Sequence, residues 1–381
     1  MNQMTNPSTL FHASRQWASR PDDQRFLSLT ELHDTVARGR ANSKATVLST
    51  RQIEVQPAND DQTKGIQIVG PNGGVTTPTH WSFGQLAGLA KAPAGYLRNL
   101  PAPIVADCMN YGLRFNRDAE DVGLLLTKTD SAESNGDFGQ IELRAATGPR
   151  YGRVWNEDIV AALINKFGDG RTGDFRVPGE FGKQVEITRN NTTIYGSDRD
   201  MFVFLADEEH RIDMQGRRNG EPGSLARGFF VWNSEVGSTS FGVAFFLFDY
   251  VCMNRIVWGV KQYSEMRLRH TVSAPEKWLD QAEPLLMEYA NSAAGPIEET
   301  IRNAQAKKLD SDLDDFLKSR KFNKSQVAAI KAVHEAEEGR PIETLWDVTV
   351  GVTAYAKSIQ YQDDRVAVER AGGKILDLVA A

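Results

Sequence analysis

The stretch FFVWNSEVGSTSFGVAFFLFDYVC, residues 229–252, decides the fold because it is the most apolar run in the chain. A polar block interrupts it at Asn233, Ser234 and Glu235, and Gly237 follows shortly after. In the second apolar segment neither face is consistently polar, which is typical of a central strand covered on both sides. Asn233 and Gly237 tolerate left-handed backbone dihedrals, so they suit a turn. We therefore expect a strand, a polar turn and a second strand at the centre of a sheet.

The carboxylate of Glu235 needs a partner in this setting. Burying it alone would cost several kcal/mol, so it must be solvated, paired with an arginine or bound to a ligand. The sequence LRAATGPRYGRVW, residues 143–155, offers Arg144 on a predicted strand and Arg150 after a Gly-Pro turn. Two interpretations stay open: a Glu–Arg pair that holds the sheet together, or a strand end whose polar block points into a pocket.

Two basic stretches predict a groove for an anionic ligand. Arginine beside an aromatic ring is the pairing that holds phosphate and stacks a base. Alternate residues of KQYSEMRLRH, residues 261–270, share one face when the chain is extended. Arg217, Arg218 and Arg227 would converge on the same groove; the alternative is that all these charges are solvated and balance nearby acidic residues. The candidate nucleic-acid-binding residues are Arg144, Arg150, Tyr151, Arg153, Tyr263, Arg267 and Arg269.

The length and texture of the chain predict its domain organisation. With 381 residues the chain is too long for one ordinary core. Strand-like patterns precede residue 272 and helical patterns follow it. The predicted class is α+β, with a mixed or antiparallel sheet core, flanking helices and an all-helical C-terminal segment. We predict a flexible arm at 1–25, a core domain at 26–272 and a helical domain at 273–381.

Capping residues and glycines predict where individual elements begin and end. Asn156 is expected to cap a helix that Gly168 ends. The Pro-Asn-Gly-Gly cluster at 71–74 predicts a tight turn between two short strands. In the helical segment, the pair Gly372-Gly373 is expected to break the last helix.

Charge and cysteine usage exclude several classes of protein. A net charge of −6 argues against a uniformly basic DNA-binding domain, but it is compatible with a local basic groove. Cys108 and Cys252 lie far apart and the six histidines are scattered, so we expect no metal, no cofactor and no disulfide. No apolar run is long enough to cross a bilayer and the N-terminus lacks a signal-peptide core, so we expect a cytoplasmic protein with no membrane partner.

One enzymatic alternative rests on carboxylates. Asp198 and Asp200 flank Arg199 and, together with Glu235, could bind divalent metal ions in a nuclease. A hairpin loop explains the same residues at least as well.

A third alternative is an interaction protein that counters a host defence. Its binding surface would be the apolar stripe of Trp346, Val350 and Tyr355 in the helical segment. Core packing explains that stripe more simply.

A family resemblance is carried by five stretches: RPDDQRFLSLTELHDTVARGRA, HWSFGQLAGLAKAPAGYLRNLP, LRAATGPRYGRVWNEDIV, WNSEVGSTSF with VCMN, and TLWDVTVGVTAYAK. Together they resemble the phage/plasmid-like family built on domain of unknown function 932, in order from about residue 20 to residue 375. The chain departs from the family at Asn254-Arg255, where Asn-Gly is expected. The resemblance implies a phage or mobile-element origin and a bacterial cytoplasm, but no agreed activity and no catalytic residues.

The function that we expect is therefore non-enzymatic. A groove at the sheet would bind single-stranded DNA, in annealing or protection during phage replication or recombination. The expected partners are nucleic acid and further copies of the same chain, as a homo-oligomer.

Overall fold

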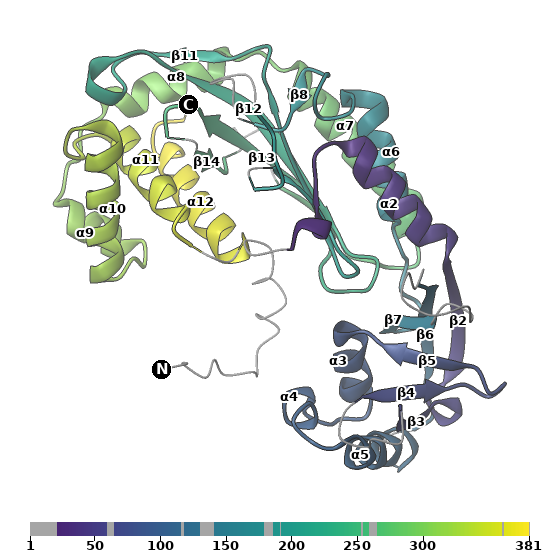
Figure 1. Ribbon diagram of the computed structural model, residues 1–381. Coiled ribbons are helices and arrows are strands. Elements are labelled where there is room, and N and C mark those ends of the chain that lie inside the picture. Colours follow the sequence, from purple (N-terminus) through teal and green to yellow (C-terminus); the bar gives the residue numbers. More distant parts are fainter. Residues whose placement is uncertain are drawn as a thin grey trace.

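Two β-sheets with helices packed around them form the described part of the chain. The computed structural model describes residues 21–58, 65–115, 118–129, 141–178, 186–190, 192–252, 254–258, 265–359 and 362–380 (Figure 1). The smaller sheet lies at one end of the molecule, the larger sheet in the middle and the C-terminal helices at the other end (Figure 1). The fold is α+β with a helical C-terminal segment, as the sequence predicts.

The larger sheet is antiparallel throughout its described pairs. Its order is β1-β9-β10-β12-β13-β14, with β8 beside β10, β11 beside β12 and β15 beside β13. The strands are β1 (Arg25–Phe26), β8 (Phe175–Arg176), β9 (Ile194–Gly196), β10 (Met201–Asp207), β11 (Ile212–Met214), β12 (Gly223–Asn233), β13 (Phe241–Asp249), β14 (Asn254–Ile256) and β15 (Met266–Leu268).

The smaller sheet has the order β2-β6-β7-β5-β4-β3. Its pairs are antiparallel except for β5 and β7, which run parallel. The predicted turn at 71–74 connects β4 to β5. The strands are β2 (Ser43–Ser49), β3 (Glu54–Pro57), β4 (Ile66–Val69), β5 (Val75–Pro78), β6 (Asp121–Lys128) and β7 (Ile141–Thr147), and helices α3 (His80–Leu89), α4 (Ala94–Leu97) and α5 (Ala102–Phe115) pack on them.

Strand β13 is covered on both faces, because every one of its residues is buried. On one face the sheet packs against helices α2 (Leu29–Ala41), α6 (Asn156–Phe167) and α7 (Ala274–Asn291). The other face carries an aromatic layer that includes Phe204, Phe230 and Phe246, joined by Val366 of helix α12 (Gln362–Leu376). The prediction of a central strand, made from the lack of a polar face, is confirmed.

The C-terminal helices share a core with one end of the larger sheet. Ile212, Leu225 and Trp258 from the sheet side pack in one cluster with Ile301 and Trp346 from the helices. The helices of this cluster are α8 (Gly295–Ala306), α9 (Leu313–Ser319), α10 (Lys324–Glu338), α11 (Leu345–Ala356) and α12.

The prediction that Gly372-Gly373 breaks the last helix is wrong. Both glycines lie inside α12. A Cβ atom on Gly372 would come within 2.7 Å of the Thr353 side chain, and one on Gly373 within 2.2 Å of the Val257 carbonyl oxygen. The glycines therefore let α12 pack against α11 and against the segment that follows β14.

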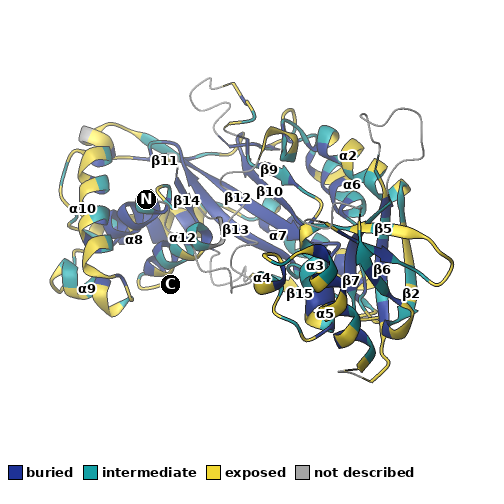
Figure 2. Cartoon of the chain, turned by 60° about the horizontal axis from the view of Figure 1, so that its bottom comes forward, coloured by how far each residue is buried: buried dark blue, intermediate teal, exposed yellow. Residues whose placement is uncertain are grey.

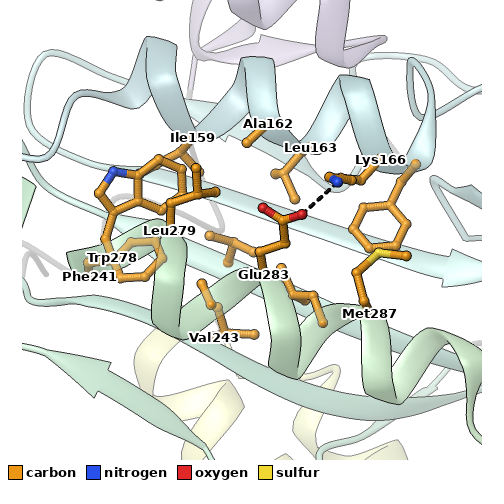
Figure 3. A pocket seen from close by; sticks show the side chains of 14 residues that line it. Ile159, Ala162, Leu163, Lys166, Phe241, Val243, Trp278, Leu279, Glu283 and Met287 are labelled. Atoms are coloured by element: carbon orange, nitrogen blue, oxygen red, sulfur yellow. Dashed lines mark ion pairs between the residues drawn. The ribbon is translucent and has the colours of Figure 1, made fainter. Parts of the chain in front are cut away.

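A narrow apolar cavity lies between α6, α7 and the sheet (Figure 3). It measures about 20 Å³, and its lining residues include Lys166 and Glu283, which form an ion pair of 2.5 Å. A single water needs roughly 10–15 Å³ of such space and several polar partners. The cavity is therefore a packing gap in the core, too small for a ligand.

A bilayer span would need a longer and more apolar helix than any among the described residues.

Candidate functional site: the turn at Glu235 and the arginines around it

The polar block after β12 is buried. Asn233 and Ser234 are fully buried and Glu235 is 4% exposed. Gly237 has a φ of +84°, in the left-handed region that favours glycine, and so completes the turn toward β13. The sequence predicted the turn, but the structure shows that its side chains point into the protein.

The carboxylate of Glu235 binds two donors from different elements. Its Oε2 accepts a hydrogen bond of 3.1 Å from Nη2 of Arg144 on β7. Its Oε1 accepts one of 2.9 Å from the backbone N–H of Asn156, the first residue of α6. The residue before α6, Trp155, supplies no side-chain cap, so Glu235 satisfies a free N–H and complements the positive end of the helix. Asn156 is therefore not the cap that the sequence predicts.

The side chain of Arg144 is buried and hydrogen-bonded in this arrangement. It is 9% exposed. Besides Glu235, its Nε and Nη2 donate to the backbone carbonyl of Asp198, at 3.3 and 2.7 Å. The predicted role of Arg144 in holding a phosphate is wrong, because its guanidinium is buried and already bound to protein oxygens.

Asn233 and Ser234 fix the same turn from the other side. Asn233 Nδ2 donates to the carbonyl of Val154 at 2.9 Å and to Oδ1 of Asn156 at 2.7 Å. Ser234 Oγ donates to the carbonyl of Arg199 at 2.7 Å. We call Arg144, Asn156, Asn233, Ser234 and Glu235 the Glu235 junction. Of the two open interpretations, the junction matches the Glu–Arg pair that holds the sheet together.

Helix α3 also reaches the turn. Nε1 of Trp81 and Nε2 of Gln85 both donate to the carbonyl of Val236, at 3.0 and 2.8 Å. Gln85 Oε1 accepts from the N–H of Ala146 at 2.9 Å, which ties the helix to β7 as well. Nothing in the sequence pointed to Trp81 or Gln85, because they bind a backbone carbonyl.

Tyr151 and Arg153 cover the outer side of the junction. Tyr151 donates its hydroxyl to the carbonyl of Ser234 at 2.7 Å, and its ring stacks on His270 with 4.8 Å between centroids. Burial raises the pKa of Tyr151. Arg153 Nε donates to the carbonyl of Glu235 at 2.8 Å, and its guanidinium lies 5.6 Å from the Tyr151 ring centroid. The expectation that Tyr151 stacks a base is wrong, because His270 and Arg153 already lie against its ring.

Three predicted arginines are exposed beside the junction. Arg150 precedes Tyr151, while Arg267 and Arg269 lie in and after β15. A hydrogen bond of 3.1 Å from the Gly152 N–H to the His270 carbonyl holds the two segments together. The segments touch so closely that a Cβ on Gly152 would lie 1.8 Å from the Thr271 carbonyl oxygen. We call Arg150, Arg153, Arg267, Arg269 and His270 the outer basic patch.

The members of this patch differ in whether they already form an ion pair. Arg267 pairs with Glu265 and lies over the Trp232 ring, 5.4 Å from its centroid. Within the described residues, no carboxylate pairs with Arg150 or Arg269. Tyr263, the remaining predicted residue, lies outside the residues that the structure describes.

Arg217 and Arg227 do not join this patch, so the predicted convergence is wrong. Arg217 is fully buried between Asp249, at 2.7 Å, and Glu338, at 2.6 Å. Arg227 pairs with Asp207 at 3.2 Å. Both arginines form buried ion pairs, because a buried charge needs an oppositely charged partner.

The carboxylates proposed for a nuclease do not gather. Asp200 is buried and pairs with its neighbour Arg199 at 3.1 Å, while Glu235 belongs to the junction. In the described ranges, no group of three or more His, Cys, Asp or Glu residues is placed to hold a metal ion. The geometry therefore gives the nuclease alternative no support.

The apolar stripe of the third alternative is mostly core. Trp346 and Val350 are each 1% exposed, and Tyr355 packs against the same cluster. A partner could reach these side chains only by displacing the helices around them.

One family model matches the chain. The model is described as a domain of unknown function (DUF932), and it matches residues 183–371. Residues 183–371 are a DUF932 domain. No curated protein and no solved structure matches the chain.

The Glu235 junction combines residues that precede the DUF932 domain with residues inside it. Asn233, Ser234 and Glu235 lie inside the matched residues, whereas Arg144 and Asn156 precede them. The junction thus ties the DUF932 domain to β7 and α6. The outer basic patch is divided in the same way, with Arg150 before the domain and Arg269 within it.

Proposed function

We propose that this protein is non-enzymatic and binds single-stranded nucleic acid through the outer basic patch. The observation that carries the proposal is the pair Arg150 and Arg269, two exposed guanidiniums on adjacent segments held together by Gly152 and His270. No carboxylate neutralises either of them within the described residues, so both can bind phosphate.

The surroundings of the pair favour a phosphate ligand. Guanidinium groups bind phosphate oxygens with two parallel hydrogen bonds. The half-buried Arg153 is anchored to the junction by its hydrogen bond to Glu235, so it adds fixed positive charge to the patch. A rigid support reduces the entropy lost when the strand binds. Binding would rest on backbone contacts, because the ring of Tyr151 is already stacked.

The biological setting is part of the same proposal. We infer a bacterial cytoplasm, where the free thiols Cys108 and Cys252 would persist. Annealing or protection of single strands during replication of a phage or mobile element would suit a protein that holds the backbone without base recognition.

The test is fluorescence anisotropy of labelled oligo-dT across a salt series, with the double variant Arg150→Ala/Arg269→Ala. We expect the Kd at low salt to rise about tenfold or more, because each lost phosphate contact weakens binding and lowers the salt slope by roughly 1. Arg302→Ala, an exposed arginine on α8, is the matched control and should leave the Kd unchanged.

Two results would overturn the proposal. One is the absence of binding to oligo-dT or oligo-rU at low salt; the other is equal binding by the wild type and the double variant. Gel analysis of the same oligonucleotide after incubation with Mg²⁺ checks the non-enzymatic part, which cleavage would contradict.

A further inference from the structure

Helix α5 carries apolar side chains on the face that points away from its own core. Ile104, Tyr111 and Phe115 are 48%, 59% and 72% exposed, and Cys108 is exposed as well. The opposite side of the helix, with Val105, Met109 and Leu113 among others, is buried against the smaller sheet. The helix lies at the lower end of the molecule in Figure 1 and at the lower front of the same lobe in Figure 2.

The spacing of these four residues is that of a helix–helix seam. The positions 104, 108, 111 and 115 are separated by four, three and four residues, which is the a/d pattern of two heptads. The rings of Tyr111 and Phe115 already contact each other, with centroids 5.4 Å apart. An amphipathic surface helix needs only one apolar stripe to face its core, so the second stripe indicates a second contact.

We propose that α5 pairs antiparallel with α5 of a second copy of this chain, about a two-fold axis near residues 109–110. In that arrangement Cys108 faces Tyr111 of the other copy, and Ile104 faces Phe115. A contact of this kind is isologous, with the same residues buried on both copies.

Charge complementarity favours a second copy over another partner. Asp107 and Arg114 are seven residues apart, so they lie on one flank of the seam. In an antiparallel pair the same flanks of the two helices meet, which places Asp107 of each copy beside Arg114 of the other. Among the described residues of one chain, Arg114 pairs loosely with Glu54, at 3.7 Å, and both side chains are more than 40% exposed.

The size of the contact predicts a weak dimer. A helix of 14 residues is about 21 Å long, so one helix pair lies at the small end of specific interfaces. We therefore expect concentration-dependent association rather than a permanent dimer.

Sedimentation velocity over a range of protein concentrations tests the association. Tyr111→Glu places a charge in the seam and should raise the dimer Kd at least tenfold. Asp107→Arg and Arg114→Asp alone should each weaken the dimer, whereas the double variant Asp107→Arg/Arg114→Asp restores opposite charges across the two-fold axis and should recover it. Glu54→Gln is the control for the loose intrachain pair and should leave the Kd unchanged.

Chemical cross-linking locates the contact. Cys252 is buried, so Cys108 is the one exposed thiol of the chain's two cysteines. A short bis-maleimide should yield a covalent dimer from the wild type and none from Cys108→Ser. A protein that stays monomeric throughout, or a dimer that neither Tyr111→Glu nor the charge exchange affects, would overturn the proposal. If the wild type is monomeric and Tyr111→Glu loses oligo-dT binding, the stripe belongs to nucleic-acid binding and the dimer is rejected.

Discussion

At the scale of single residues, Glu235 is a group whose removal leaves a buried arginine without its charge partner. It is buried, and it binds both the Arg144 guanidinium and the Asn156 N–H. Glu235→Gln keeps an oxygen for the N–H but leaves Arg144 as an unpaired buried charge. We expect a loss of about 3–5 kcal/mol in the free energy of unfolding, the range for a broken buried ion pair, measured by urea denaturation.

Two further variants test whether the loss of stability comes from the unpaired buried charge. Arg144→Met combined with Glu235→Gln removes both charges, so it should cost less than Glu235→Gln alone. Glu283→Gln breaks a partly exposed pair with Lys166 and should cost about 1 kcal/mol or less. A Glu235→Gln variant no less stable than this surface control would contradict a structural role for the junction.

The same residues show how far the sequence could be read. A carboxylate within an apolar run requires a partner, and this physical rule points to an arginine of the 143–155 stretch. The rule could not tell a closed junction from an open pocket. The deciding contacts are the Asn156 N–H and the Asp198 carbonyl, and backbone groups look the same at every position of a sequence.

At the scale of elements, the pair Gly372-Gly373 and Asn156 led to wrong predictions. Gly372 and Gly373 are usually helix breakers, yet here they serve close packing inside α12, which only the neighbours of the helix determine. Asn156 resembles a cap, but the free N–H groups of α6 meet a carboxylate that is distant in sequence. Strand β13 was predicted correctly, because burial on both faces leaves a direct pattern in the residues.

Helix α11 offers a prediction with a pH dependence. Thr344 and Asp347 form a capping box, and Asp347 also accepts 2.6 Å from Arg340. Burial acts to raise the pKa of Asp347, but hydrogen bonds from Arg340 and from the amides of Glu343 and Thr344, with His334 Nε2 nearby at 3.7 Å, outweigh it and hold the pKa well below its usual range.

Because the pKa is depressed in the folded protein, Asp347 binds fewer protons in the folded chain than in the unfolded chain. Its stabilising effect is therefore complete above the unfolded pKa of about 3.9 and is lost as pH falls through the lower folded value. Asp347→Asn should cost about 1–3 kcal/mol at pH 7. Urea denaturation from pH 7 downward should show the gap to the wild type narrowing only below about pH 4; a gap that stays constant down to acid pH would reject this assignment.

At the scale of the whole molecule, buried ion pairs join the C-terminal helices to the larger sheet. Arg217 near the start of β12 pairs with Glu338 of α10, and Arg255 of β14 pairs with Glu369 of α12 at 3.1 Å. These pairs cross the domain boundary predicted at 272/273. The change of sequence texture there is real, since strands precede it and helices follow it. The pattern of residues indicates secondary structure, however, and carries no information on which segments share a core.

The shared core leads to a prediction about a truncated chain. A fragment of residues 26–272 would expose Ile212, Leu225, Leu247 and Trp258, which pack against the C-terminal helices in the full chain. It would also leave the fully buried Arg217 without Glu338. Each large apolar side chain that loses its cover costs about 1.5–3 kcal/mol, so the four together cost an amount comparable with the whole typical stability of about 5–15 kcal/mol. We expect the fragment to aggregate or to lack cooperative thermal unfolding by circular dichroism, whereas the full chain unfolds in one transition. A soluble fragment with a cooperative transition would show instead that residues 26–272 are an independent domain and that the helices are an appendage.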